Sequence, residues 1–206
     1  MFYILIIASY ILGSVPTAYI FGKFFKKIDI RDFGSGNVGA TNALRVLGIK
    51  MGIVTLLIDI LKGVAAVLLC KFILPESSDL MMIACGLAAI VGHIFTVFLK
   101  FKGGKGVATS AGVFAAICPI PFVITILVFV ILVWITKYVS LGSIIGALVL
   151  FVSELIINLN NSFAELEKLV FVFIIALFII IKHKANIKRL IAGSENKISF
   201  KKINSD

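Results

Sequence analysis

Apolar runs long enough to cross a lipid bilayer recur along this sequence. Phe2–Phe21, Met51–Phe72 and Leu80–Leu99 each provide the roughly 20 residues that a transmembrane helix needs. The chain is 61% hydrophobic and its mean hydropathy is +1.16, which is more apolar surface than a soluble domain of 206 residues requires. We therefore expect an all-α polytopic membrane protein in which residues 1–206 form a single membrane-embedded domain.

Shorter apolar runs extend the prediction to seven transmembrane helices. These runs are Val107–Cys118, Phe122–Thr136, Ile144–Leu159 and Leu169–Ile181. The first of them is too short to span the bilayer unless its surroundings adapt. An alternative treats residues 107–136 as one helix and gives five spans, but it requires residues 144–181 to cross once despite the polar residues around Asn160. We therefore favour seven spans.

The positive charges predict the orientation of these helices. The chain has 20 Lys and Arg residues and a net charge of +10. Only Lys71 and Lys168 fall in or beside the predicted outer loops, and Lys62 lies inside a span. Because lysine and arginine collect on the cytoplasmic side of membrane proteins, we expect the N-terminus outside and the C-terminus in the cytoplasm. This orientation accounts for the charge, so no nucleic-acid partner is predicted.

The stretch that departs most from the apolar pattern is GSGNVGATNALR at residues 34–45, on the predicted cytoplasmic side. Its glycines let backbone N–H groups turn toward an anion, and Arg45 supplies a permanent charge. A second loop on the same side, FKGGKGVAT at 101–109, places two lysines around two glycines. The two loops predict phosphate binding at the membrane surface, although lysines at helix ends also serve simply as topology determinants.

Two nucleotide-binding patterns in the first stretch fail on context. Gly34, Gly36 and Gly39 spell G-x-G-x-x-G, but an apolar run precedes them in place of the strand of a βαβ unit. The same stretch resembles a P-loop in which Ala40 stands where the lysine belongs. An ordinary glycine-rich connector remains the alternative to an anion site.

Few ionisable residues fall inside or at the edge of the predicted spans. Asp59 and Lys62 lie three residues apart on one helix face, and an internal ion pair that lowers the cost of burial is favoured over a catalytic role. His93 has no acidic residue near it in the sequence, so a structural hydrogen bond and a substrate contact are equally compatible with it. The cysteines are odd in number and lack metal-binding spacing, and we predict no metal and no cofactor.

Three polar motifs follow one another along the chain: GSGNVGATNALR at 34–45, GHIFTVFLKFKGGKGVAT at 92–109 and HKANIKRLIAGSEN at 183–196. Together they resemble the bacterial membrane glycerol-3-phosphate acyltransferases that use acyl phosphate (the PlsY family). The resemblance covers essentially the whole chain and departs from the family pattern at Thr96, where proline is expected. It implies transfer of a fatty acyl group from acyl phosphate to the 1-hydroxyl of sn-glycerol 3-phosphate, which gives lysophosphatidate and phosphate in the first step of phospholipid synthesis.

The resemblance also implies the residues of the site. Catalytic roles fall to Ser35, Asn37, His183 and Asn186. Binding of substrate phosphate falls to Gly36, Thr41, Asn42, Arg45, His93, Lys102, Gly103, Gly104, Lys105, Ser140, Ser143 and Glu195. The expected partners are glycerol 3-phosphate, acyl phosphate and membrane lipid, without an obligate protein partner. The expected location is the bacterial cytoplasmic (inner) membrane, with the active site on the cytoplasmic face.

The sequence contains no pattern for covalent catalysis. It has no nucleophile elbow, no Ser–His–Asp order, and no acid four residues after either histidine. An acyl phosphate is already activated, so proximity, charge clamping and oxyanion stabilisation are sufficient, and a substrate phosphate is one hypothesis for the base.

The alternative function is a transporter of a phosphorylated solute. A transporter predicts inverted repeats and broken helices near the midplane, whereas this sequence shows no internal repeat and its polar residues gather at one interface.

Overall fold

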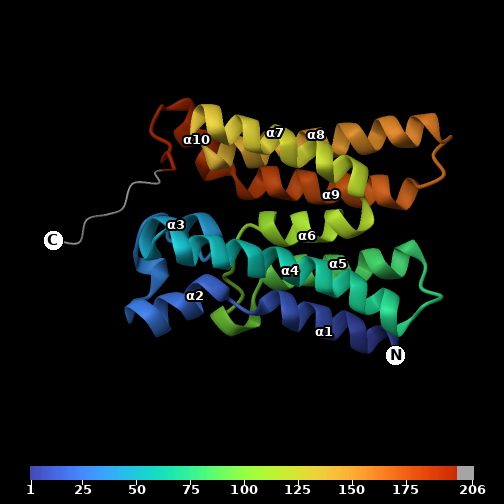
Figure 1. The fold of residues 1–206 in the computed structure, drawn as a ribbon, viewed down its shortest axis with the longest axis horizontal. Helices are drawn as coiled ribbons and strands as arrows, with labels where there is room; N and C mark the ends of the chain where they lie inside the picture. Colours follow the sequence, from blue (N-terminus) through green and yellow to red (C-terminus); the bar gives the residue numbers. More distant parts are fainter. Residues whose placement is uncertain (199–206) are drawn as a thin grey trace.

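The structure is a computed structural model that describes residues 1–198, and all regular secondary structure in this part is helical. The end of the predicted basic tail, residues 199–206, lies outside that part. Figure 1 shows two layers of helices, with α1 to α5 in one layer, α7 to α9 in the other, and α6 between them. The helices are α1 (Phe2–Ser14), α2 (Thr17–Phe21), α3 (Ala40–Leu47), α4 (Ile49–Ile73), α5 (Asp79–Ile94), α6 (Val107–Ile117), α7 (Pro119–Thr136), α8 (Val139–Asn160), α9 (Leu166–Lys182) and α10 (Lys184–Ile191). Short helical turns cover Gly22–Lys26 (η1), Ile30–Asp32 (η2) and Val97–Leu99 (η3).

All seven predicted apolar segments are helical, but their number of membrane crossings stays a prediction. Among residues 1–198, four helices, α4, α5 with η3, α7 and α8, are long and apolar enough to span a bilayer, and a fifth span results if α1 is counted together with α2 and η1. The short α6 ends at Ile117, after which the chain reverses and α7 runs back along the bundle (Figure 1). Residues 107–136 therefore do not form the single helix of the five-span alternative.

A break in the first apolar segment, between α1 and α2, divides it into two helices that meet at 42°. Pro16 causes this break because its ring removes a backbone donor and collides with the preceding turn. The carbonyl groups of Ser14 and Val15 lose their helical partners as a result. The Ser14 carbonyl accepts a hydrogen bond instead from the Thr96 hydroxyl, and the Val15 carbonyl accepts from the Lys62 ammonium and the Thr17 N–H, as backbone groups in a membrane interior must be paired.

Glycine allows α4 and α6 to pack in direct backbone contact. A Cβ atom on Gly63 would lie 2.1 Å from the Thr109 carbonyl oxygen, and one on Gly112 would lie 1.9 Å from the Ile60 carbonyl oxygen. Small residues at such crossings are the usual way in which membrane helices approach closely. The main apolar core lies beside this contact, where the rings of Phe114 and Phe171 are 5.4 Å apart.

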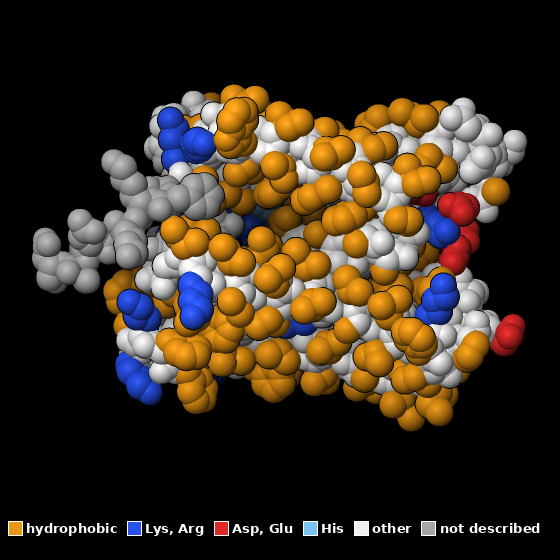
Figure 2. All heavy atoms as spheres, in the orientation of Figure 1, with side chains coloured by type: hydrophobic (Ala, Val, Ile, Leu, Met, Phe, Trp, Pro, Cys, Tyr) orange, Lys and Arg blue, Asp and Glu red, His pale blue; other side chains and the backbone are white. Residues whose placement is uncertain are grey.

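Charge divides the two ends of the bundle. Figure 2 shows an apolar belt over the middle, most of the visible lysine and arginine side chains at the end that carries α2, α3 and α10, and the visible acidic side chains, with some basic ones beside them, at the opposite end. The short α4–α5 and α8–α9 connections lie at that acidic end, and the motif loops lie at the basic end. The predicted grouping of the three motifs at one end is therefore confirmed, and the side of the membrane they face stays a prediction.

Candidate active site

A pocket of about 340 Å³ lies between the two layers at the basic end of the bundle. Its polar walls come from the loop before α3, from α3 itself, from the start of α8 and from the chain around α10. Its apolar walls come from α4, α6, α7 and α8. The polar lining includes Ser35, Asn37, Thr41, Arg45, Lys105, Ser140, Ser143, His183, Asn186 and Glu195. The apolar lining includes Ile53, Leu56, Phe114, Phe122, Ile126, Phe129 and Leu150.

The polar end of the pocket is organised around the carboxylate of Glu195. Its Oε1 atom accepts hydrogen bonds from Ser140 (2.9 Å) and Asn186 (2.7 Å), and its Oε2 atom accepts one from Arg189 (2.7 Å). Burial alone raises the pKa of this carboxyl, but these three donors outweigh burial and hold the pKa below its usual range. An ionised carboxylate only accepts hydrogen bonds, so Glu195 orients donors in this structure.

Two cations stand beside this cluster. Lys105 donates a hydrogen bond to Oδ1 of Asn186, and burial lowers the pKa of its ammonium to about 8. Arg45 donates from Nη2 to the backbone carbonyl of Asn196 at 2.9 Å, while its Nε atom is buried without a partner among residues 1–198. Burial also lowers the pKa of Arg45. Both residues are incompletely neutralised donors at one end of a pocket, as a phosphate site requires.

His183 enters the pocket as a neutral hydrogen-bond acceptor. Its Nδ1 atom lies 2.7 Å from the carbonyl oxygen of Ile179, which only accepts, so Nδ1 carries the proton and Nε2 keeps a lone pair. Burial, and after it the neighbouring Lys105 charge, lowers the pKa of the ring to about 4. The ring is therefore uncharged at neutral pH.

Asn42 builds the first motif loop from inside. Its Oδ1 atom accepts from the backbone N–H of Ser35 (2.9 Å), and its Nδ2 atom donates to the carbonyls of Ile30 (3.2 Å) and Phe33 (3.1 Å). Asn37 similarly accepts from the Gly39 N–H at 2.9 Å. These contacts fix the loop that carries Ser35 into the pocket.

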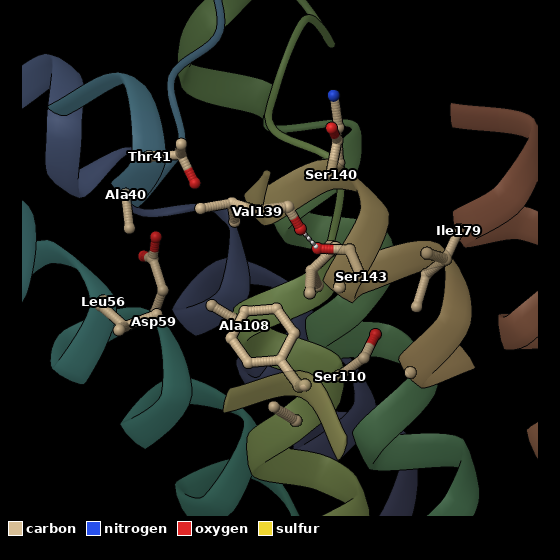
Figure 3. A pocket seen from close by; sticks show the side chains of 18 of the residues that line it. Ala40, Thr41, Leu56, Asp59, Ala108, Ser110, Val139, Ser140, Ser143 and Ile179 are labelled. Carbon is tan, nitrogen blue, oxygen red and sulfur yellow. Dashed lines mark hydrogen bonds between the residues drawn. The ribbon is translucent and has the colours of Figure 1, made fainter. Parts of the chain in front are cut away.

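Polar side chains from opposite layers of helices face the same cavity. Figure 3 shows Thr41 and Asp59 on one wall and Ser140 and Ser143 on another. The Ser143 hydroxyl donates to the Val139 carbonyl at 2.9 Å, so its remaining capacity toward a ligand is as an acceptor.

Some implied residues lie near the pocket without lining it. Gly36, Lys102, Gly103 and Gly104 are absent from the lining, and the backbone N–H groups of the three glycines donate to Phe33, Ile94 and His93 carbonyls respectively. Their N–H groups are thus occupied within the protein. His93 does line the pocket, and the structure brings Asp59 to 4.0 Å from its ring.

Sequence reasoning missed several residues of the site. Arg189 donates a hydrogen bond to Glu195. It lies three positions after Asn186, so the two side chains share one helix face, and this spacing could have identified Arg189 from the sequence. The backbone of Asn196 gave none, because its contact with Arg45 joins residues 151 positions apart. The apolar lining was also not separable from ordinary lipid-facing residues in a sequence this hydrophobic.

These features define a class: a helical membrane protein whose cationic pocket continues into an apolar cavity. The family model for glycerol-3-phosphate acyltransferase matches residues 3–193. The chain is 49% identical to glycerol-3-phosphate acyltransferase 2 of Bacillus anthracis, over 94% of this chain and 97% of that one. It is 45% identical to the glycerol-3-phosphate acyltransferase of Macrococcus caseolyticus, over 97% and 98%.

Solved structures agree with the sequence relatives. The fold matches the crystal structure of PlsY, an integral membrane glycerol 3-phosphate acyltransferase, in its glycerol 3-phosphate form with a TM-score of 0.85, at 35% identity and 96% coverage of both chains. The lysophosphatidic acid form of PlsY matches with a TM-score of 0.82. The chain therefore belongs to the glycerol-3-phosphate acyltransferase family and is an integral-membrane acyltransferase. The family resemblance of the three motifs is confirmed.

Proposed function

We propose that this acyltransferase takes its acyl group from acyl phosphate and transfers it to the 1-hydroxyl of sn-glycerol 3-phosphate. The observation that carries the proposal is the continuity of the pocket, which joins Lys105 and Arg45 to an apolar wall formed by α4 and α7. Both substrates have a phosphate group that suits the cationic end. The fatty chain of the donor suits the apolar wall, where α7 is exposed along most of its length.

In the reaction, the glycerol 1-hydroxyl attacks the acyl carbonyl carbon. A new ester C–O bond forms, the bond from the carbonyl carbon to the phosphate oxygen breaks, and inorganic phosphate leaves. The site supplies Lys105 and Arg45 for the phosphate charges, and Ser35, Thr41 and Ser140 as hydroxyl partners. A phosphate leaving group needs no covalent acyl-enzyme, so holding the two substrates together and stabilising charge account for catalysis.

The hydroxyl proton needs an acceptor within the pocket. His183 presents a lone pair at Nε2, but a ring with a pKa of about 4 is a weak base. We assign it the role of a hydrogen-bond acceptor that orients the hydroxyl, together with Asn37 and Asn186 as polar neighbours. The proton itself goes to a phosphate oxygen of a substrate. Lys102, Gly103, Gly104, Gly36 and Asn42 shape the loops around the substrate phosphates.

The proposed setting is the bacterial cytoplasmic membrane, with residues 1–206 as one domain, seven spans and the pocket on the cytoplasmic face. The basic end of the bundle, which carries the three motifs, supports this orientation. Glycerol 3-phosphate reaches the pocket from the cytoplasm, and the acyl chain reaches it from the lipid.

One assay tests the donor. Purified protein receives glycerol 3-phosphate together with either acyl phosphate or acyl-CoA, and lysophosphatidate is quantified. We expect product with acyl phosphate and none with acyl-CoA. Equal turnover with acyl-CoA would overturn the assignment of the donor.

A further inference from the structure

A group of buried polar residues lies where α2 and α4 meet, and it borders the pocket through Asp59. Asp59 and Lys62 are 1% and 4% exposed, and their side chains are 2.7 Å apart. Thr17, at the start of α2, donates its hydroxyl to Asp59 at 3.0 Å and receives a hydrogen bond from Lys62 at 2.6 Å. Ionisable groups inside a membrane-spanning helix are expensive to bury and are therefore candidates for a functional role.

On one side, this group closes the break in the first apolar segment. Lys62 donates to the Val15 carbonyl, which lies at the break between α1 and α2 and also accepts the Thr17 N–H at 3.1 Å. The direction of α2, which leads into the first motif loop, therefore depends on a lysine of α4.

On the other side, the group reaches His93 and the second motif loop. The Nδ1 atom of His93 lies 4.0 Å from Asp59 Oδ1, and the ring is 8% exposed. The opposite edge of the ring lies directly against Gly104, because a Cβ atom there would be 2.2 Å from His93 Nε2. The Gly104 N–H also donates to the His93 carbonyl at 3.0 Å, so both the ring and the backbone of His93 support the loop.

Lys105 follows Gly104 directly. Its ammonium is the cation that reaches Asn186 from the second motif, and its place is set by the loop that rests on His93. A contiguous path of contacts therefore runs from Lys62 through Asp59 and His93 to Gly104 and Lys105.

We propose that Asp59 and Lys62 are positioning residues for acyl transfer, which fix the His93 ring and thereby the loop that presents Lys105. This inference rests on the proposed function in one respect, the role of Lys105 as a phosphate ligand. The buried ion pair thus has a kinetic role in addition to filling the membrane interior.

Two variants separate positioning from folding. Asp59→Asn alone leaves Lys62 as an unpaired buried cation, which destabilises the protein. The double variant Asp59→Asn with Lys62→Met removes both charges and is expected to restore the thermal unfolding temperature in detergent close to that of the parent. We expect kcat/KM for glycerol 3-phosphate to remain at least about tenfold below the parent in this double variant.

A third variant reaches the same loop by another route. Gly104→Ala places a methyl group against the His93 ring and leaves the buried charges intact. We expect it to reproduce the kinetic loss of the double variant. The matched control is Glu154→Gln, which replaces a similarly buried acid (2% exposed) on α8. Asn158 donates a hydrogen bond to this carboxyl at 3.1 Å. The control should change stability without changing kcat/KM.

A pH profile supplies a readout that a purely structural role would not move. Lys105 is faced by Glu195, Arg189 and Arg45, and burial holds the pKa of its ammonium at about 8. If the loop shifts and Lys105 meets solvent, the alkaline limb of kcat/KM moves to higher pH in the double variant and in Gly104→Ala.

Two results would overturn the inference: a stable double variant with the kinetics and alkaline limb of the parent, or a loss no larger than that of Glu154→Gln. Failure of the proposed function looks different, because the parent enzyme itself would then be inactive with acyl phosphate. The variants can still be compared with whichever donor the parent uses.

Discussion

Lys105 and Asn186 are joined by a hydrogen bond from Nζ to Oδ1, although 81 residues separate them in the sequence. This contact joins the second motif to the third across the two layers of helices. Asn186 in turn donates to Glu195 at 2.7 Å, so the position of the lysine charge depends on a carboxylate from the end of the third motif. Lys105 is a partly buried cation, and this burial is the main reason for its lowered pKa.

The lowered pKa of Lys105 predicts an alkaline limb in the activity. The ammonium predominates below pH about 8 and is lost as pH rises through that value. Because kcat/KM reports ionisations of the free enzyme, we expect kcat/KM for glycerol 3-phosphate to be level below pH about 8 and to fall above it, by about tenfold per pH unit. Steady-state assays between pH 6 and about pH 10 measure this directly.

Unfolding would not explain this limb. Between pH about 8 and the ordinary lysine pKa of 10.5, the unfolded chain binds more protons at this lysine than the folded chain, so its contribution to stability rises with pH. Lys50→Met, which removes an exposed lysine at the start of α4, should leave the limb in place. A limb that is absent from the parent would show that the Lys105 charge is not required.

The helices of this fold were accessible to sequence reasoning because apolar runs of bilayer length have few alternatives to helix. The predicted run Leu169–Ile181 corresponds to α9 (Leu166–Lys182), and Met51–Phe72 corresponds to α4 (Ile49–Ile73). The break in the first run was not predicted, although Pro16 was a visible signal. The internal Asp59–Lys62 ion pair was predicted and is confirmed at 2.7 Å.

Contacts between helices were not accessible in the same way. The approach of His93 to Asp59 depends on how α5 packs beside α4, and spacing within one helix carries no information about that. The return of the chain after α10, which brings Glu195 between Ser140 and Asn186, follows no periodic pattern. The motifs therefore indicated which residues gather, and the structure gives the partner of each.

Thr96 stabilises the broken first segment, since its hydroxyl donates to the carbonyl of Ser14. Proline, the residue expected from the family pattern at this position, has no such donor. We predict that Thr96→Val lowers the free energy of unfolding by about 1–3 kcal/mol because a buried carbonyl loses its partner. Thermal unfolding in detergent measures the change.

The matched control for this variant is Thr55→Val. Thr55 is fully buried in α4 and its hydroxyl has no partner among residues 1–198, so its removal should be neutral or stabilising. Equal destabilisation by the two variants would show that the Thr96 hydrogen bond contributes no more than general packing.

The topology can be tested by labelling single cysteines in intact cells. Ser35, Lys105 and Asn196 belong to the three motifs at the basic end of the bundle, and Glu76 lies in the α4–α5 connection at the other end. We predict that cysteines at the first three positions are protected from an impermeant reagent and that a cysteine at position 76 is labelled. Labelling of position 105 from outside would reverse the proposed orientation.

Arg45 gives the sharpest test of the anion site. One of its terminal nitrogens holds the Asn196 carbonyl at 2.9 Å, and its Nε atom faces inward without a partner in the described chain. The planar guanidinium can bind a phosphate by two parallel hydrogen bonds, whereas the lysine ammonium is a point charge. Arg45→Lys therefore keeps the charge and loses the geometry.

We predict that Arg45→Lys lowers kcat/KM for glycerol 3-phosphate by about tenfold to a hundredfold, since one charge-assisted hydrogen bond contributes about 1.5–3 kcal/mol. Folding and membrane insertion should be unaffected, because the residue lies in a short helix at the end of the bundle. Lys71→Ala, an exposed charge at the far end of α4, is the matched control and should be nearly silent in the same assay. If Arg45→Lys retains full activity, or if both variants lose the same amount, Arg45 serves only as a charge for topology, and the loop at residues 34–45 does not hold a substrate phosphate.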